Sequence, residues 1–434
     1  MFSSFVSCSG LRAEDADMTG RERVLGLLVR AQSDGAYSNL ALDAELAKNA
    51  SERAFVTALF YGTVERRMTL DHIIRTYSKT EFDDIETQTL QLLRMGLCQL
   101  MFMDIPESAA VNETVKLAPQ RTKGYINAIL RSFLRDGKQI RLDGLDRLGT
   151  LSVKYSCARW IVKMWVRDYG DEQTEKMLAS SFGRPPVYAR VNTCVCDADD
   201  LIYELAEDGV RADRYNDSEN CVVLENAGSI EQLRAYRNGL FHVQDISSQK
   251  CCELLAPRPG DIVTDLCAAQ GGKTFTLAEI MNNSGTVYSS DLYESRVKLI
   301  RDGAERLGLD IIKARVGDAS IRDEALPMAD RVLCDVPCSW LGVIRRKPEI
   351  KYKKKADIDG LPEIQYKILR NAAGYVKDGG RLVYSTCTLN RAENEDIAGR
   401  FAAENSAFRL IGMKTYFPEN DGGDGFFTAL FEKS

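Results

Sequence analysis

The 434-residue sequence predicts an α/β protein with a doubly wound, mainly parallel sheet, preceded by an all-helical domain. From about residue 241 onward, short apolar runs alternate with segments of helical spacing, and this alternation indicates a parallel sheet. Residues 19–150 show helical spacing throughout and contain only two prolines, Pro106 and Pro119. The stretch 151–240 is mixed, and we predict a small connecting α+β subdomain there.

Apolar stripes at helical spacing define the first domain, residues 19–150. Three of these stripes are Val24, Leu28 and Ala31; Leu90, Leu93 and Leu97; and Ile126, Ile129 and Phe133. Residues three and four apart lie on one face of a helix, so each stripe is expected to face a core. Met18 directly precedes the first periodic segment. Residues 1–18 are therefore predicted to be a disordered extension, with Met1 and Met18 as alternative translation starts.

Strand-like runs define the two later segments. Within 151–240, the run 187–192 follows two prolines and predicts a strand. Within the predicted C-terminal domain, residues 241–434, strands are predicted at 262–266, 286–289, 311–316, 331–334 and 381–384, and a final antiparallel strand at 426–431. Helices are predicted between them, for example at 294–307 and 363–377.

The composition argues against several classes of protein. No stretch approaches the roughly 18 uninterrupted apolar residues of a transmembrane helix, so no membrane partner is expected. Twelve cysteines without a recognisable secretion signal predict reduced thiols in a cytoplasm. Only two histidines are present and no Cys-x-x-Cys pair occurs, so no metal site is expected.

Two basic runs stand out against the net charge of −6. Residues 120–141 carry six cations against Asp136, a local net charge of +5, and residues 341–355 carry seven cations against Glu349, a local net charge of +6. Either run alone is typical of a solvated surface. Two such runs on an acidic chain favour a path that follows the phosphates of a nucleic acid.

Two cysteines lie in contexts that suit catalytic thiols. Cys338 follows the predicted strand 331–334, and Cys387 follows the predicted strand 381–384. Both are expected near carboxyl ends of strands, where open α/β sheets bind their ligands. A thiolate there can attack an electron-poor ring carbon, while a second group handles the proton that leaves later. The alternative for each cysteine alone is a small buried core residue.

A loop of small residues follows the first strand of the predicted sheet and precedes a helix. Its members are Cys267, Ala268, Ala269, Gln270, Gly271, Gly272 and Lys273. Small side chains let the backbone approach a ligand, and the amino end of the helix offers unpaired N–H groups. The end of the loop copies a nucleoside-triphosphate P-loop. That motif needs glycine at position 267, so triphosphate binding is disfavoured.

Acidic residues at two further strand ends predict an adenosine-containing cofactor. Asp291 is placed to accept from ribose hydroxyls, and Asp318 is placed to accept from an adenine amino group. Arg296, in the helix after Asp291, is a further candidate cofactor residue. Each acid alone is typical of a helix cap or a solvated loop. Because there is no Gly-x-Gly-x-x-Gly motif, S-adenosylmethionine is favoured over a dinucleotide.

These motifs resemble those of the Nol1/Nop2/Sun RNA cytosine-5 methyltransferases. The matching segments are 265–274, 335–348, 385–387 and 393–395, and segments 60–63, 110–113 and 127–131 resemble a NusB-type RNA-binding fold. The combination is similar to the bacterial Sun/Fmu enzymes. The resemblance implies a Rossmann-like methyltransferase domain that uses S-adenosylmethionine, preceded by a NusB-like domain.

The resemblance also implies an activity and roles for individual residues. The implied reaction is methylation of C5 of a cytosine in 16S ribosomal RNA by a monomer, and the usual target in the family is cytosine 967. Cys387 is implied as the nucleophile that adds to C6, and Cys338 as the group that enables release. Asp335 is implied at the N3 edge of the cytosine and beside the cofactor. A nearby cation, for example Lys273 or the bound sulfonium, is expected to lower the pKa of the attacking thiol.

The chain departs from the family pattern at two positions. Gln270 replaces the proline of the cofactor loop. Trp340 replaces a glycine shortly after Cys338, where its ring either stacks on the target base or obstructs it. The target itself is expected to be single stranded or flipped out, because C6 is buried in a stacked helix.

Several alternatives remain open from the sequence. One is methylation of transfer RNA, and another is a catalytically weak RNA-binding or ribosome-assembly factor. A DNA cytosine-5 methyltransferase would use Cys338 as its nucleophile and would not need Cys387, and no DNA-reading domain is recognisable. A serine hydrolase is disfavoured because no nucleophile elbow accompanies His242.

Overall fold

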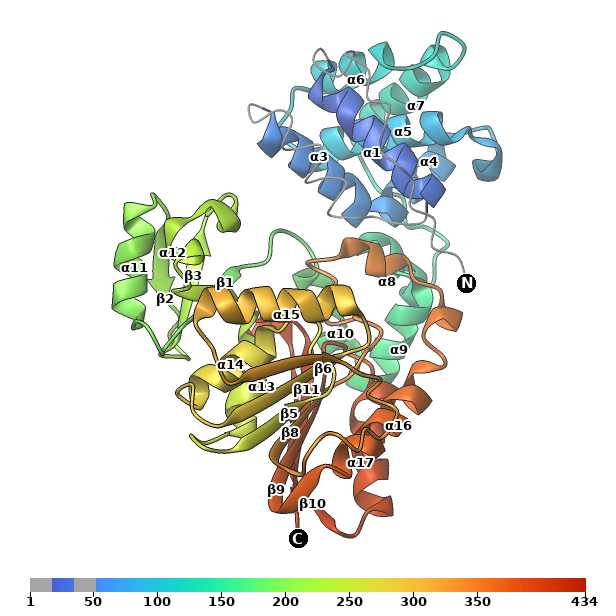
Figure 1. The fold of residues 1–434 in the computed structure, drawn as a ribbon. Helices are drawn as coiled ribbons and strands as arrows, with labels where there is room; N and C mark the ends of the chain where they lie inside the picture. The colour runs from blue at the N-terminus through green and yellow to red at the C-terminus, as the bar shows by residue number, and fades with distance from the viewer. Residues whose placement is uncertain (1–17, 35–51) are drawn as a thin grey trace. The chain divides into compact units, whose positions relative to one another are not determined.

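The computed structural model describes residues 18–34 and 52–434 and contains two compact units, Met1–Lys163 and Met164–Ser434 (Figure 1). The predicted disordered extension, residues 1–18, lies outside the described residues except for Met18. The domain bounds at residues 150 and 240 stay predictions. In the described ranges, none of the helices combines the length and the apolar character needed to cross a membrane.

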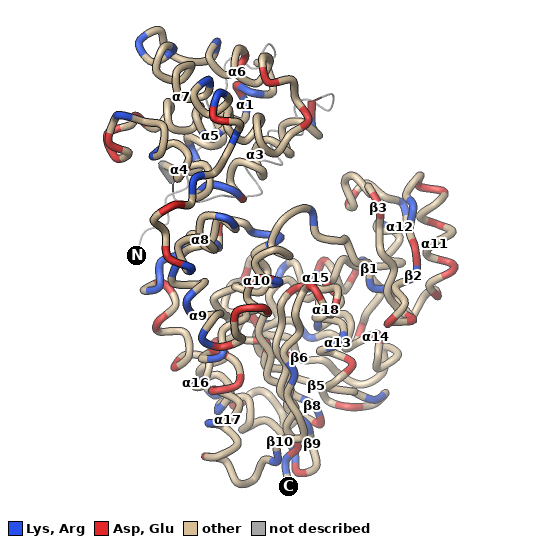
Figure 2. The backbone as a smooth tube through the Cα atoms, turned by 180° about the vertical axis from the view of Figure 1, so that it is seen from behind, with Lys and Arg blue, Asp and Glu red and all other residues tan. Residues whose placement is uncertain are grey.

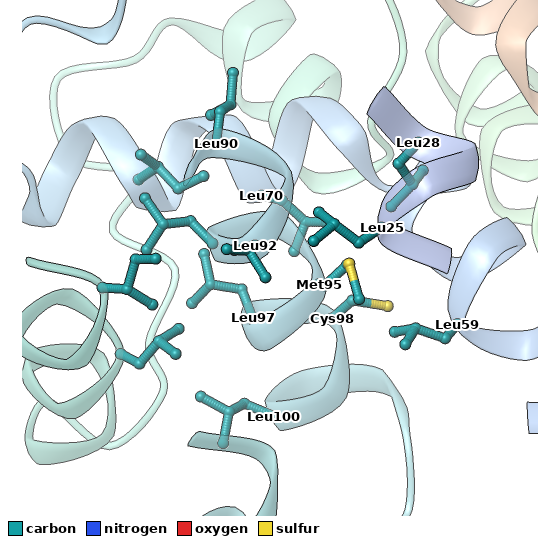
Figure 3. Packing of buried hydrophobic residues seen from close by; sticks show 14 of the residues in the cluster. Leu25, Leu28, Leu59, Leu70, Leu90, Leu92, Met95, Leu97, Cys98 and Leu100 are labelled. Atoms are coloured by element: carbon teal, nitrogen blue, oxygen red, sulfur yellow. The ribbon is translucent and has the colours of Figure 1, made fainter. Parts of the chain in front are cut away.

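The first unit is built of α-helices packed around α5 (Thr87–Phe102). The helices around it are α1 (Gly20–Asp34), α3 (Arg53–Glu65), α4 (Arg67–Tyr77), α6 (Glu107–Lys116), α7 (Lys123–Arg135) and α8 (Arg147–Lys154). The α5 leucines meet Leu28, Leu59 and Leu70 of α1, α3 and α4 in one core (Figure 3). All three predicted stripes are buried, because each is the apolar face of an amphipathic helix.

The second unit begins with a small antiparallel sheet in the order β2-β3-β1-β4. Its strands are β1 (Val187–Val191), β2 (Arg211–Arg214), β3 (Cys221–Glu225) and β4 (Phe241–Val243), with helices α11 (Ala198–Glu207) and α12 (Arg234–Arg237); α9 (Arg159–Tyr169) and α10 (Asp171–Ser180) precede it. Val191, Leu201 and Phe241 are buried in its core. This is the α+β subdomain predicted from the mixed pattern.

The larger sheet has seven strands in the order β10-β11-β9-β8-β5-β6-β7. They are β5 (Ile262–Asp265), β6 (Thr286–Asp291), β7 (Ile312–Val316), β8 (Ala329–Asp335), β9 (Val376–Thr386), β10 (Phe408–Tyr416) and β11 (Phe426–Lys433). β5 to β9 pair in parallel, whereas β11 pairs antiparallel to both β9 and β10. The doubly wound sheet and its antiparallel final strand are confirmed.

Helices cover both faces of this sheet (Figure 1). They are α13 (Ile246–Leu255), α14 (Gly272–Ile280), α15 (Glu294–Leu307), α16 (Leu361–Ala373), α17 (Glu395–Glu404) and the short α18 (Pro418–Asp421). Val332 packs in the core with α16 and α17, whereas its neighbour Leu333 packs in the core with α13, α14 and α15. Successive strand residues point to opposite faces, so a strand covered on both sides is apolar at every position.

Two elements differ from the prediction. The helix predicted at 363–377 ends at Ala373, and β9 begins at Val376. Local spacing could not show this, because Val376 continues the helical stripe in sequence. β10 was not predicted at all, since most of its residues are exposed at the edge of the sheet and form no apolar run.

Candidate active site

The two predicted thiols lie side by side at the carboxyl ends of β8 and β9. These strands are parallel neighbours, with Asp335 opposite Ser385 in the register. Cys338 and Cys387 follow three and two residues later, respectively, and their Sγ atoms are 3.3 Å apart. Cys338 is 6% exposed, whereas Cys387 is half-buried. The sheet register therefore converts a separation of 49 residues into a contact between two sulfur atoms.

Asp335 lies between the thiols and the cofactor loop. One carboxylate oxygen accepts from Lys273 Nζ at 2.7 Å, and the other accepts from Ser385 Oγ at 2.7 Å. Burial of Lys273 acts against its charged form, but the Asp335 carboxylate prevails and raises the pKa of Lys273 above its usual value. Lys273 is thus held as a cation by Asp335, in direct contact with it rather than with either thiol.

A buried carboxylate, Glu393, ties the two cysteine loops together. It accepts from Ser339 N at 2.9 Å, from Ser339 Oγ at 2.5 Å, from Gln365 Nε2 at 2.8 Å and from Asn390 Nδ2 at 2.7 Å. Glu393 is fully buried, and four donors compensate the loss of its hydration. The loop after Cys338 is therefore fixed from the segment that follows Cys387.

Backbone contacts complete this junction. Gly342 N donates to Cys387 O at 3.1 Å, and Gly425 N donates to Gly342 O at 2.9 Å. A Cβ on Gly342 would lie 1.8 Å from the carbonyl oxygen of Gly425, so glycine is required by the close approach of the chain. Ser339 Oγ and Thr388 Oγ1 share a hydrogen bond of 2.6 Å, which adds a side-chain link between the same two loops.

Lys353 is the cation that lies near the thiols. Its Nζ donates to Ser339 O at 3.0 Å. Burial lowers the pKa of Lys353, while Cys338, Glu393 and Cys387 act electrostatically in the opposite direction. Burial raises the pKa of Cys338 well above its usual value, and its contact with Cys387 raises it further. Lys273 is paired with Asp335, and Lys353 is a second candidate for the cation that activates the thiol; this activation stays a prediction.

The predicted cofactor loop connects β5 to α14 and meets Asp291 at the end of β6. Ala269 N donates to the Asp291 carboxylate at 3.1 Å, and Arg296 Nη1 approaches the same oxygen at 3.4 Å. Gly271 precedes α14 with a φ of 93°, a left-handed conformation that suits glycine, and Gln270 is exposed. Cys267, Ala268, Gly272 and Lys273 complete the loop, so the structure brings the predicted cofactor residues around Asp291 together.

A cavity of about 300 Å³ lies at the carboxyl ends of β5, β6 and β7. Asp318 lines it with Leu266, Ser290, Gly317 and Ala319. The Ser290 hydroxyl is buried and has no hydrogen-bond partner among the described residues. An unpaired polar atom facing a cavity fits a ligand with polar groups. The residues present therefore fit a nucleoside-containing cofactor.

Part of the basic run 341–355 is buried or paired within the second unit. Arg346 is held by Asp424 at 2.6 Å and by Asp245 at 2.9 Å. Lys351 is fully buried, with its ammonium 3.8 Å from the centroid of the Phe182 ring. These cations support the fold of the second unit. Arg346 and Lys351 therefore make contacts with residues distant in sequence, and the phosphate path along this run stays a prediction.

Several cations of the run 120–141 lie along α7 (Figure 2). Arg131 and Arg135 are hydrogen bonded only to neutral side chains, Asn127 and Ser132, among the described residues. Their charges are therefore available to an anionic partner. Other cations of this run pair with surface carboxylates, for example Arg121 with Glu86.

Sequence reasoning missed the structural roles of Glu393, Ser385 and Lys353. The sequence marks Glu393 as part of a family motif, but it does not predict that the carboxylate is buried and accepts four hydrogen bonds. Lys353 was counted as one charge in a basic run. The only sequence signal was their position within or beside the cysteine motifs, and it does not specify the contacts.

A parallel sheet with paired thiols and a cofactor-sized cavity at its carboxyl edge defines a Rossmann-like methyltransferase. The profile of the 16S rRNA methyltransferase RsmB/F family matches residues 252–432, that of the NusB family matches 18–135, and that of the RsmF/B-like ferredoxin-like domain matches 157–231. The chain belongs to the RsmB/F family of 16S rRNA methyltransferases.

Relatives match along nearly the whole chain. The probable ribosomal RNA small subunit methyltransferase B of Bacillus subtilis (strain 168) is 38% identical, over 95% of this chain and 98% of that protein. The corresponding protein of Synechocystis sp. is 32% identical, over 92% and 96%.

Solved structures are similar as well. The crystal structure of PH0851 is 26% identical with a TM-score of 0.79, over 96% of this chain and 99% of that chain. NSun6 from Pyrococcus horikoshii, solved with SFG, is 21% identical with a TM-score of 0.57 over 63% of this chain and 97% of that chain, which supports the fold alone.

Proposed function

We propose that this protein methylates C5 of a cytosine in small-subunit ribosomal RNA through a covalent bond between Cys387 and C6 of the base. The observation that carries the proposal is the pair of sulfur atoms 3.3 Å apart beside Asp335, at the edge of the sheet where the cofactor cavity opens. One thiol can form the covalent bond while the other assists its cleavage. A methyltransferase acting on an exposed heteroatom needs neither thiol.

The difference in burial supports an order for the two thiols. The raised pKa of Cys338 keeps that thiol protonated at neutral pH, and a protonated thiol is a poor nucleophile. Cys387 is more exposed than Cys338, so its sulfur is the more accessible of the two to an incoming base. Cys387 is therefore the nucleophile of the proposed reaction.

The Cys387 thiolate adds to C6 and forms an S–C6 bond, and the displaced electron pair makes C5 nucleophilic as N3 takes up a proton. The Asp335 carboxylate accepts a hydrogen bond from that N3–H. S-adenosylmethionine, when bound, supplies an electrophilic methyl group that C5 attacks. The C5 proton and the N3 proton, the latter first supplied by water, then pass to water, the C5–C6 double bond re-forms and the S–C6 bond breaks. The Cys338 S–H donates to the departing Cys387 sulfur.

The cofactor assignment rests on this chain's own residues. The loop 267–273, Asp291 and Arg296 surround the start of α14, and Asp318 lines the adjoining cavity. NSun6, which shares the fold, was solved with SFG, an analogue of S-adenosylmethionine. The relatives from Bacillus subtilis and Synechocystis carry names that refer to the small ribosomal subunit, which supports that RNA as the substrate.

Replacing each thiol separately tests the mechanism. With S-adenosylmethionine and a small-subunit RNA transcript, Cys338→Ala is expected to accumulate a covalent protein–RNA adduct, because the departing sulfur loses its proton donor. Cys387→Ala is expected to form no adduct and no 5-methylcytosine. Denaturing gels with labelled RNA measure the adduct. Cys194→Ala, a half-buried cysteine outside the site, is the matched control and should behave like the unmodified protein.

Methylation by Cys387→Ala would overturn the assignment of the nucleophile. The substrate is tested by bisulfite mapping of RNA from cells that lack the gene. Loss of one 5-methylcytosine from 16S RNA, at position 967 in the family's usual numbering, supports the proposal. An unchanged 16S map together with a loss in transfer RNA would redirect the substrate to transfer RNA.

A further inference from the structure

Trp340 is an exposed aromatic ring beside the thiols. Its relative exposure is 40%, whereas Cys338, Ser339 and Leu341 around it are 6%, 0% and 1% exposed. The backbone of Trp340 has a φ of 65°, a conformation that disfavours any side chain with a Cβ. The loop thus presents the largest side chain to solvent at a position where glycine would be less strained.

The loop that carries Trp340 is held on both sides. Ser339 N donates to Glu393, and Val343 N donates to Trp340 O at 3.0 Å. Gly342 is fixed against Cys387 O, as described above. Because the backbone is held on both sides, the Cα atom of Trp340 has a defined position two residues from Cys338.

Two lysines accompany the ring. The ammonium groups of Lys347 and Lys353 each lie 4.7 Å from the centroid of the Trp340 ring. Lys353 is also anchored to Ser339 O. Lys347 is exposed; its ammonium lies over this ring and acts electrostatically on the Glu349 carboxyl, and its exposure lets it move to a phosphate. An aromatic ring with adjacent cations is the arrangement that binds a stacked base and its phosphate.

We propose that Trp340 is a stacking platform for one unpaired nucleobase of the substrate RNA next to the methylated cytosine, and that Lys347 binds the phosphate of that stacked nucleotide. The inference rests on the proposed function for the identity of the RNA. Trp340 acts as a positioning residue, because it holds the strand so that the target base reaches Cys387.

The test compares Trp340→Gly and Trp340→Phe in the full-length protein. Trp340→Gly relieves the backbone strain, so the variant is expected to fold. Loss of one base–aromatic stack should raise the KM for RNA roughly 5- to 100-fold, with kcat changed by less than about threefold. Trp340→Phe keeps an aromatic face and should restore most of the affinity.

An abasic-site series locates the stacked nucleotide. RNA oligonucleotides with one abasic nucleotide near the target are assayed with the unmodified protein and with Trp340→Gly. At one position, the abasic nucleotide should weaken binding to the unmodified protein but not to the variant. Lys347→Gln should reduce the salt dependence of KM by about 0.7 in log–log slope, the value for one phosphate of a single strand. Lys298→Gln, an exposed lysine on α15, is its control.

The outcomes separate this inference from the proposed function. If the unmodified protein methylates RNA but Trp340→Gly has an unchanged or lower KM, the ring does not stack on a base. A higher kcat in Trp340→Gly would show that the ring obstructs the target base. If the unmodified protein methylates no RNA, the proposed function fails. Quenching of tryptophan fluorescence by single-stranded RNA then tests the stacking independently. The quenching should occur in the unmodified protein and be lost in Trp340→Gly. Equal quenching in both proteins would overturn the inference.

Discussion

At the scale of the residue, the environments of the two cysteines differ, as do the roles that the family resemblance implies for them. Cys338 is buried and its pKa is raised, whereas Cys387 is half-buried and lies near Lys353. Burial penalises a thiolate because it removes hydration, and a nearby cation compensates part of that loss. The proposed division between attack by Cys387 and release by Cys338 is consistent with this difference in burial.

Lys353→Gln is expected to move the pH dependence of the reaction. The rate rises with pH as the attacking thiol loses its proton, and a cation favours the deprotonated form. Removing the cation shifts this rise to higher pH, so kcat/KM at pH 7 should fall roughly three- to tenfold and recover near pH 9. A pH–rate profile of kcat/KM measures this effect.

The control for that profile is Lys298→Gln, in which kcat/KM should rise over the same pH range as in the unmodified protein. A loss of activity in Lys353→Gln that is equal at every pH would contradict an electrostatic role. It would instead indicate that Lys353 acts only through its hydrogen bond to Ser339 O.

At the scale of the element, the site depends on loops that cross close to one another at the ends of β8, β9 and β11. Glu393 and Gly342 hold these crossings, the first through four accepted hydrogen bonds and the second through the lack of a side chain. The loop after β8 runs over 336–347 and buries Leu341 and Ile344. The contacts between these loops hold this edge of the sheet together.

Two glycine substitutions test this close approach. Gly342→Ala should destabilise the second unit by at least about 2 kcal/mol, because the added Cβ overlaps the Gly425 carbonyl. Gly399→Ala in α17 has nothing within 4 Å of its added Cβ and should stabilise the helix by about 0.5–1 kcal/mol. Urea unfolding followed by circular dichroism measures both changes. Equal stability of the two variants would show that the loop crossing adapts.

At the scale of the whole molecule, the candidate active site and the basic helix α7 lie in different units. The thiols, the cofactor loop and the cavity all belong to the second unit, whereas the exposed cations of α7 belong to the first. Each unit has its own hydrophobic core. We therefore expect the second unit to fold without the first.

A fragment of residues 156–434, which keeps α9 intact, is expected to bind S-adenosylmethionine with an unchanged Kd. Its KM for RNA should rise at least about tenfold, because the phosphate contacts of the α7 cations are lost. Calorimetry and methylation assays measure the two quantities. An unchanged KM for RNA would show that the first unit does not contribute to binding this substrate.

Much of the fold and the residues of the candidate site could be predicted from local patterns. The helix predicted at 294–307 matches α15 to the residue, because its apolar stripe and its final glycine are local signals. β10 could not be predicted, since an edge strand buries few side chains. The neutralisation of Arg346 by Asp245 and Asp424 was likewise hidden, because its partners are 101 and 78 residues away.

Most strands and helices, in their order along the chain, and the chemical groups at their ends were specified by the sequence alone. Periodicity and small-residue motifs are local properties, so they can be recognised without the fold. Tertiary structure alone decided that two sulfur atoms lie 3.3 Å apart, that Lys273 pairs with Asp335, and that Trp340 stands exposed beside two lysines. These contacts depend on strand order and register, which are set by packing of the whole sheet. Residue spacing along the chain does not contain that information.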